Sequence, residues 1–170
     1  TDRIVAATQR LVRARGENPP GQEAETVATL AAVCRERDLG VRTEAAEAGR
    51  DNLFARTTGD AGGPALLLLG HTDVVPVGEG WTRDPYGGEI EDGKLYGRGS
   101  VDMLFITATM AAVTREVART GNTGGTLAFV GMADEEARGG LGVRFMSENH
   151  PDAFSWKNCL SETGGSHLPG

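Results

Sequence analysis

The chain has 170 residues, 39% hydrophobic and 24% charged, which is enough for one globular domain with a hydrophobic core. The formal net charge is −7, and no run of Lys or Arg exceeds two neighbours, which argues against nucleic acid or an anionic membrane as the partner. No apolar stretch approaches the roughly 18 residues that a membrane span needs. Two cysteines, Cys34 and Cys159, make no disulfide framework and are interpreted as buried thiols, so a cytoplasmic location is expected.

The N-terminal part of the chain is predicted to form two helices and two short strands. Residues 4, 5, 8, 11 and 12 recur at helical spacing, and Asn18-Pro19-Pro20-Gly21 ends this first helix because proline cannot continue it. A second helix is expected over Gln22–Leu39, followed by a glycine that suits a helix end. Short strands are expected at about Val41–Glu44 and Asn52–Arg56.

Apolar strands and helices alternate through the rest of the chain. Residues 65–69 are apolar at every position, as in a strand that is covered on both faces. A long loop over 70–88 leads to a hairpin around Asp92-Gly93. The elements expected after it are a helix from Asp102 to Ala118, a strand Leu127–Met132, a helix Gly140–Asn149 and a strand Asn158–Ser161. This alternation indicates an α/β layer fold without an internal repeat or a domain linker.

Polar side chains that can bind a metal follow three of the apolar strands at once. His71-Thr72-Asp73 follows the first, Asp134-Glu135-Glu136 the second, and Ser161-Glu162 the third. Open α/β sheets bind ligands at the carboxyl ends of their strands, so these groups can meet although they lie far apart in sequence. Asp102 stands at the start of a predicted helix, where a carboxylate can also serve simply as a cap.

Each of these residues has a structural explanation when it is considered alone. A single histidine after a strand is more often hydrogen-bonded than a ligand, and Glu135-Glu136 is more often a solvated helix start. Their joint placement favours a metal site, because one imidazole with several carboxylates is a donor set that suits zinc or similar ions. A site with four acidic groups also needs positive charge, since mutual repulsion would otherwise raise their pKa values.

Specific motifs occupy nearly the whole chain in a fixed order. They are Asn18-Pro19-Pro20-Gly21 with Glu23, Leu66–Pro76, Trp81, Asp84-Pro85-Tyr86, Gly93–Met103, Asp134-Glu135-Glu136 with Gly139-Gly140, and Leu160–Gly165. Together they closely resemble the zinc aminoacylase and carboxypeptidase family, which includes acetylornithine deacetylase, succinyl-diaminopimelate desuccinylase, aminoacylase and glutamate-releasing carboxypeptidases. The resemblance implies a three-layer α/β/α catalytic domain, with a mixed sheet and helices on both faces.

The resemblance also implies two divalent metal ions, Zn²⁺ in the first place and Co²⁺ as an alternative. Four residues would hold them: His71, Asp102, Glu136 and Glu162. Asp102 would bridge both ions, His71 and Glu162 would complete the first, and Glu136 would bind the second. A cis peptide is expected at Asp102-Met103.

The implied reaction is hydrolysis of the amide bond of an N-acyl amino acid or a small peptide. The two ions would lower the pKa of a shared water and polarise the scissile carbonyl. Glu135 would act as the general base and pass the proton to the leaving nitrogen, and Asp73 would orient His71. No Ser or Cys nucleophile is required, and Gly-x-Ser-x-Gly is absent from the sequence.

The chain departs from the family in three ways, of which Ser161, where the family often has asparagine before the last glutamate, is a minor change. After Asp102-Met103 the family usually has Lys-Gly, whereas Leu104-Phe105 stands here and would alter packing behind the metals. Family members are also much longer, with a lid or dimerisation domain and a distal histidine ligand. His150 and His167 are predicted to be surface residues and do not replace that ligand. Residues 1–170 are therefore expected to be the N-terminal portion of the catalytic domain, without the lid through which a homodimer would form.

Two other hypotheses stay open. A non-enzymatic metal-binding or scaffold protein on the same fold is favoured by the missing segments and by Leu104-Phe105, but the intact ligand set and Glu135 oppose it. A different two-zinc aminopeptidase group of similar fold is opposed by the segment Gly97–Met103. The sequence does not distinguish an acyl-amino-acid deacylase from a desuccinylase or a dipeptidase.

Overall fold

The computed structural model describes residues 2–37, 39–57, 59, 63–121, 124–154 and 156–162. Within these residues the α-helices are α1 (Asp2–Arg13), α2 (Ala24–Val33), α3 (Leu104–Thr120) and α4 (Phe145–Asn149). Short helical turns are η1 (Glu135–Ala137), the π-helical η2 (Gly140–Arg144) and η3 (Pro151–Ala153). The strands are β1 (Leu39–Glu47), β2 (Arg50–Thr57), β3 (Ala65–His71), β4 (Glu89–Glu91), β5 (Lys94–Tyr96), β6 (Thr126–Met132) and β7 (Cys159–Leu160). None of the described helices has the length and apolar character to span a membrane.

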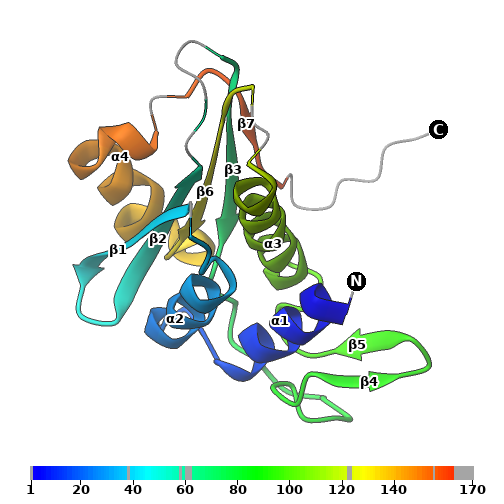
Figure 1. The fold of residues 1–170 in the computed structure, drawn as a ribbon. Helices are drawn as coiled ribbons and strands as arrows, with labels where there is room; N and C mark the ends of the chain where they lie inside the picture. Colours follow the sequence, from blue (N-terminus) through cyan, green and yellow to red (C-terminus); the bar gives the residue numbers. More distant parts are fainter. Residues whose placement is uncertain are drawn as a thin grey trace, which may run out of the picture.

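The strands of the main sheet lie in the order β1-β2-β6-β3-β7, and β4 pairs with β5 in a separate hairpin (Figure 1). Strand β2 is antiparallel to β1 and β6, whereas β3 is parallel to β6 and β7, so the sheet is mixed. His71 at the end of β3 lies opposite Met132 at the end of β6. The segments that follow these two strands therefore leave the sheet at the same level.

Each face of the sheet has its own hydrophobic core, because successive side chains of a strand point to opposite faces. Leu68 and Phe129 belong to the core that α1, α2 and α3 cover. Their neighbours Leu67 and Val130 belong to the core beneath η2, α4 and η3. Figure 1 shows the sheet between these two helical layers. The predicted three-layer α/β/α fold is thereby confirmed.

The boundaries of several elements differ from the sequence-based predictions. Helix α2 ends at Val33 instead of Leu39, because Leu39 pairs with Thr57 as the first residue of β1. The helix predicted from Asp102 begins at Leu104, after a cis Asp102-Met103 peptide, as the resemblance implied. The predicted helix over 140–149 is a π-helical turn followed by one short α-helix.

Two predictions about single residues were wrong. Cys159 is exposed because β7 is a short strand at the edge of the described sheet, although Cys34 is buried as predicted. His150 is half-buried, with its ring 5.6 Å from that of Phe145. Leu104 is buried in the main core, and the predicted effect of Leu104-Phe105 on packing behind the metals stays a prediction. His167 lies outside the described residues.

The turn η2 approaches the end of β6 so closely that only glycine fits at position 142. A Cβ atom added to Gly142 would lie 1.9 Å from the carbonyl oxygen of Ala133. Backbone atoms cannot rotate away as the end of a flexible side chain can. The contact therefore holds η2 directly against the segment that carries Asp134, Glu135 and Glu136.

We predict that Gly142→Ala lowers the free energy of unfolding by about 1–3 kcal/mol, the usual cost of overpacking. The matched control is Gly40→Ala in β1, where an added Cβ would meet only the Arg56 carbonyl at 3.7 Å. Thermal unfolding of both purified variants measures the difference. Equal melting temperatures for Gly142→Ala and wild type would contradict this account of the contact.

Candidate metal centre

His71 is placed by the last residues of β3 and by helix α3. A Cβ on Gly70 would lie 2.8 Å from the Thr107 hydroxyl oxygen, so glycine lets α3 approach the strand. The Thr107 hydroxyl then donates a hydrogen bond of 2.8 Å to the carbonyl oxygen of His71. The His71 side chain is only 1% exposed. The end of β3 is therefore held in place by contacts that do not involve the imidazole ring.

The hydrogen bonds of His71 determine which ring nitrogen faces the site. Nδ1 lies 2.9 Å from the backbone carbonyl oxygen of Asp73. A carbonyl oxygen can only accept, so Nδ1 carries the proton. Nε2 then points to the carboxylates, 3.2 Å from Asp102 Oδ1 and 3.9 Å from Glu135 Oε2. This is the orientation in which Nε2 can bind a metal ion.

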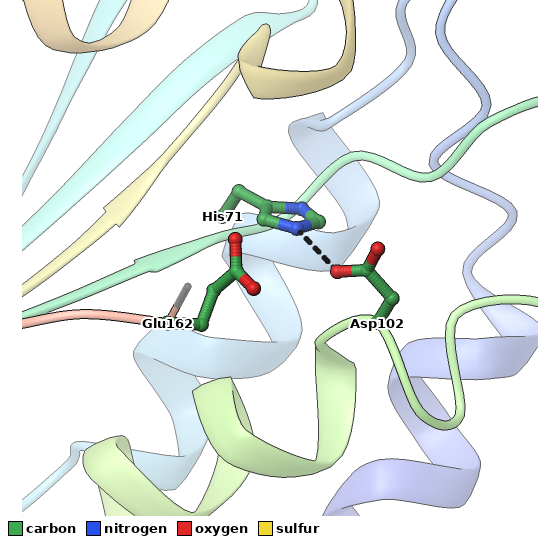
Figure 2. A group of neighbouring side chains, drawn as sticks. All are labelled: His71, Asp102 and Glu162. Carbon is green, nitrogen blue, oxygen red and sulfur yellow. Dashed lines mark hydrogen bonds and ion pairs between the residues drawn. The ribbon is translucent and has the colours of Figure 1, made fainter. Parts of the chain in front are cut away.

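Asp102 and Glu162 lie on either side of the His71 ring (Figure 2). Asp102 comes from the loop before α3 and Glu162 from the segment after β7. One ligand atom from each of the three residues lies within 4.8 Å of the others. Asp102 does not occupy the cap position of α3, which belongs to Met103. The capping role considered for Asp102 from the sequence is therefore not the one it has.

Glu135 and Glu136 form a second group with His71, again with ligand atoms within 4.8 Å of one another. Both begin the short turn η1 that follows β6. Glu136 also lines a cavity of about 280 Å³ together with Asp102 and Arg98. All four predicted ligands thus lie at the carboxyl ends of β3, β6 and β7 or beside them.

Asp73 lies directly behind the site and is fully buried. Its backbone carbonyl oxygen accepts the hydrogen bond from His71 Nδ1 at 2.9 Å. Its carboxylate Oδ1 lies farther away, 3.7 Å from the same nitrogen. The carboxylate accepts hydrogen bonds from the backbone N–H groups of Glu135 at 3.2 Å and Glu136 at 3.1 Å. Asp73 therefore connects the end of β3 to the segment after β6.

The charged groups of the site shift one another's pKa values. Burial by itself would lower the pKa of His71, but Asp73, Asp102 and Glu135 raise it above its ordinary value. Burial raises the pKa of both Glu135 and Glu136, and the neighbouring carboxylates raise it further. A bound cation relieves such repulsion, because it favours the ionised form of every carboxylate around it.

The donors fit a divalent metal ion. Each group combines one imidazole nitrogen with two carboxylates, and zinc sites in proteins commonly use these donors. The hydrogen bond from Nδ1 to a backbone carbonyl is the outer contact that a metal-binding histidine usually makes. His71, Asp102 and Glu162 would hold one ion, and Glu136 could contribute to a second beside it.

Asn18 and Arg50, which no sequence pattern marked as site residues, form hydrogen bonds beneath this cluster. Arg50 contacts Glu23 and Asp134, and Asn18 contacts Asp73 and Asp134. The motif that contains Asn18 and Glu23 contributed to the family resemblance, and positive charge was expected near the acidic groups. No local pattern marked Arg50, because its partners are 27 and 84 residues away in sequence.

Comparison with known proteins shows the family to which the chain belongs. Residues 67–167, more than half of the sequence, match the model of peptidase family M20/M25/M40. The chain is a member of this family. The match confirms the resemblance to the zinc aminoacylase and carboxypeptidase group that the motifs indicated.

Individual M20 relatives extend the comparison. The succinyl-diaminopimelate desuccinylase of Acinetobacter baumannii (strain AYE) is 41% identical over 127 residues, which are 71% of this chain and 33% of that protein. Human carnosine dipeptidase 1 has a TM-score of 0.73 at 21% identity, covering 94% of this chain and 38% of its own. An M20 family metallo-carboxypeptidase from Sulfolobus solfataricus has a TM-score of 0.78 at 18% identity, and the match covers 97% of this chain and 38% of that protein. The two structures share the fold, and this M20 chain spans about a third of the length of the curated relatives that it matches.

We predict that His71→Ala weakens zinc binding by more than the roughly 10–100-fold that loss of an outer-shell contact costs, because it removes a ligand atom. The control is His150→Ala, since His150 contacts Glu44 and Phe145 and belongs to neither ligand group. Isothermal titration with zinc compares the two variants with wild type. Unchanged zinc affinity in His71→Ala would exclude His71 as a ligand.

Proposed function

We propose that the protein is a metal-dependent hydrolase that cleaves the amide bond of an N-acyl amino acid or a small peptide. The convergence of His71 with Asp102, Glu162 and the pair Glu135-Glu136 at one edge of the sheet carries this proposal. Membership of the M20 family supports the same reaction class. Two named relatives, a desuccinylase and a dipeptidase, match the two substrate types.

In this proposal the site would hold two zinc ions, with cobalt as a functional substitute. His71, Glu162 and Asp102 would hold the first ion, and Glu136 and Asp102 would hold the second. The ions would supply Lewis acidity and a water molecule of lowered pKa. The 2.9 Å contact between Nδ1 of His71 and the Asp73 carbonyl keeps Nε2 turned toward the first ion. Asp73 thus supports a ligand on one side and the segment of Glu135 and Glu136 on the other.

Glu135 acts as the general base. Its side chain is 41% exposed, so it can reach a substrate at the open edge of the cluster. Its carboxylate lies 3.9 Å from His71 Nε2, beside the candidate ligands, where it can accept a proton from a water in the site. Glu135 takes the proton of the attacking water and delivers it to the leaving nitrogen as the amide bond breaks. No side-chain nucleophile takes part.

We further propose that residues 1–170 form the N-terminal portion of the catalytic domain of a longer protein. The match to about a third of each curated relative supports this. Among the described residues the second ion would have only Asp102 and Glu136 as ligands. A distal histidine and a lid would come from the remaining part, and the lid would also form a homodimer.

The proposed activity is tested by a panel of N-succinyl amino acids, N-acetyl amino acids and dipeptides, with zinc or cobalt supplied to full-length protein. Turnover should disappear after chelation and return with metal. We expect Glu135→Gln to keep both metals and to lower kcat by about 10²–10⁴-fold, because it removes only the base. Glu136→Gln should lose the second metal first.

Metal analysis alongside kinetics separates the two variants. Equal metal loss in Glu135→Gln and Glu136→Gln would reverse or remove their assigned roles. Absence of turnover on the whole panel in zinc-loaded wild type would contradict the proposed reaction.

The 170-residue chain by itself should turn over substrate at least roughly 100-fold more slowly than the longer protein, since it would lack a ligand and the closing lid. The measurement is kcat/KM of both forms on the best substrate of the panel, at equal zinc occupancy of the first site. Equal values would show that these residues suffice for catalysis.

A further inference from the structure

A buried chain of polar side chains runs from the candidate metal centre into the body of the fold. It comprises five residues: Glu23, Arg50, Asp134, Asn18 and Asp73. All are at least nine-tenths buried, and Glu23 and Asp73 are completely so. They come from the residue before α2, the start of β2, the segment after β6, the loop after α1 and the segment after β3. Nothing in the proposed chemistry uses Glu23, Arg50 or Asn18.

Arg50 connects two of the buried carboxylates. Its Nε and one terminal nitrogen donate to the two oxygens of Glu23 at 2.7 and 2.8 Å. The same terminal nitrogen donates to Asp134 Oδ1 at 2.8 Å. The hydrogen bonds to Glu23 raise the pKa of Arg50, so the guanidinium stays charged. Burial would raise the pKa of Asp134, but bonds from Leu141, Asn18 and Arg50 hold it below its ordinary value.

Asn18 connects Asp134 to Asp73. Its amide nitrogen donates to Asp134 Oδ1 at 3.1 Å and to Asp73 Oδ2 at 2.9 Å. Without a donor between them, these two buried carboxylates would face each other with only repulsion. The Asn18 amide therefore makes one continuous hydrogen-bonded path from Arg50 to Asp73.

The path ends on the backbone of the proposed base and ligand. Asp73 accepts the N–H groups of Glu135 and Glu136, and Asp134 accepts the N–H of Leu141 at 3.1 Å. Asp134 itself has a left-handed backbone with φ of 66°, which a non-glycine residue adopts only when its surroundings hold it there. The turn that presents Glu135 and Glu136 is thus held at both ends by hydrogen bonds to the buried carboxylates of Asp73 and Asp134.

We propose that Arg50 and Asn18 are positioning residues, which fix Asp134 and Asp73 so that Glu135 and Glu136 are held in place over the metal centre. The inference rests on the proposed function of these two glutamates. Stability alone does not explain such a network, because well-packed apolar residues often replace a buried ion pair without loss. Arginine suits the task because its planar fork binds Glu23 through two nitrogens and reaches Asp134 as well, which a lysine cannot reproduce.

The test compares variants of the full-length protein at saturating zinc by steady-state kinetics and by backbone hydrogen exchange over residues 133–141. Arg50→Met, Arg50→Lys and Asn18→Ala should each lower kcat by roughly 10–100-fold, the usual effect of losing an outer-shell partner, with KM changed less than about threefold. The N–H groups of Glu135 and Glu136 should exchange roughly tenfold faster or more, because the turn that carries them would then open locally at a lower free-energy cost.

Two further variants separate positioning from folding. Arg42→Met removes an arginine from the neighbouring strand β1, where it pairs with the exposed Asp152, and should leave kcat and exchange unchanged. The double variant Glu23→Gln/Arg50→Met removes both charges of the buried ion pair. It should recover the melting temperature that Arg50→Met loses, but not kcat or the slow exchange.

Wild-type kcat and wild-type exchange in Asn18→Ala and Arg50→Met would overturn the proposal. Recovery of kcat together with melting temperature in the double variant would overturn it as well, because the network would then be structural only. The exchange measurement does not depend on turnover. An inactive wild type would therefore refute the proposed function while exchange still decides whether Arg50 and Asn18 hold the segment.

Discussion

The parallel pairing of β3 with β6 is the constraint on which the candidate site depends. It runs without a shift from Ala65 opposite Thr126 to His71 opposite Met132, so both strands end at the same level. A slip of one residue would turn Leu67 and Leu68 to the wrong faces and expose the side chains of both cores. The packing of the sheet therefore fixes the position of His71 relative to Glu135 before any polar contact is made.

The polar contacts then convert two strand ends into one rigid unit. Asp73 follows β3 and binds the backbone after β6, and the Asp73 carbonyl also fixes the proton on His71 Nδ1. Burying Asp73, Asp134 and Glu23 together is costly unless each is hydrogen-bonded and partly neutralised. Arg50 is the cationic partner of Glu23 and Asp134, and the Asp73 carboxylate accepts hydrogen bonds from Asn18 and two backbone N–H groups. Burying these charges costs free energy, and in this account the fold retains them because they keep the side chains of the candidate site in place.

The sequence predicted the fold and the convergence of the candidate ligands better than it predicted the residues that support them. The apolar run of residues 65–69 predicted strand β3, and Leu67 and Leu68 are buried in opposite cores, although Leu66 is exposed and not covered as predicted. His71, Asp102, Glu136 and Glu162 came from motifs in which neighbouring residues are themselves informative. Asn18 and Arg50 could not be assigned in this way, because Asn18 meets Asp134 across 116 residues of sequence. Helix α2 was predicted too long because strand pairing at Leu39, a tertiary contact, overrides the local helical pattern.

The central claim is that His71 Nε2 and the surrounding carboxylates bind metal at the carboxyl ends of β3, β6 and β7. An anomalous-scattering map at the zinc absorption edge, from crystals of the full-length protein grown with zinc, tests it most directly. The account predicts one peak bound by His71 and Glu162 and a second bound by Glu136, with Asp102 between them at ligand distances of about 2.0–2.2 Å. No peak beside His71, or zinc bound only elsewhere on the chain, would contradict the account.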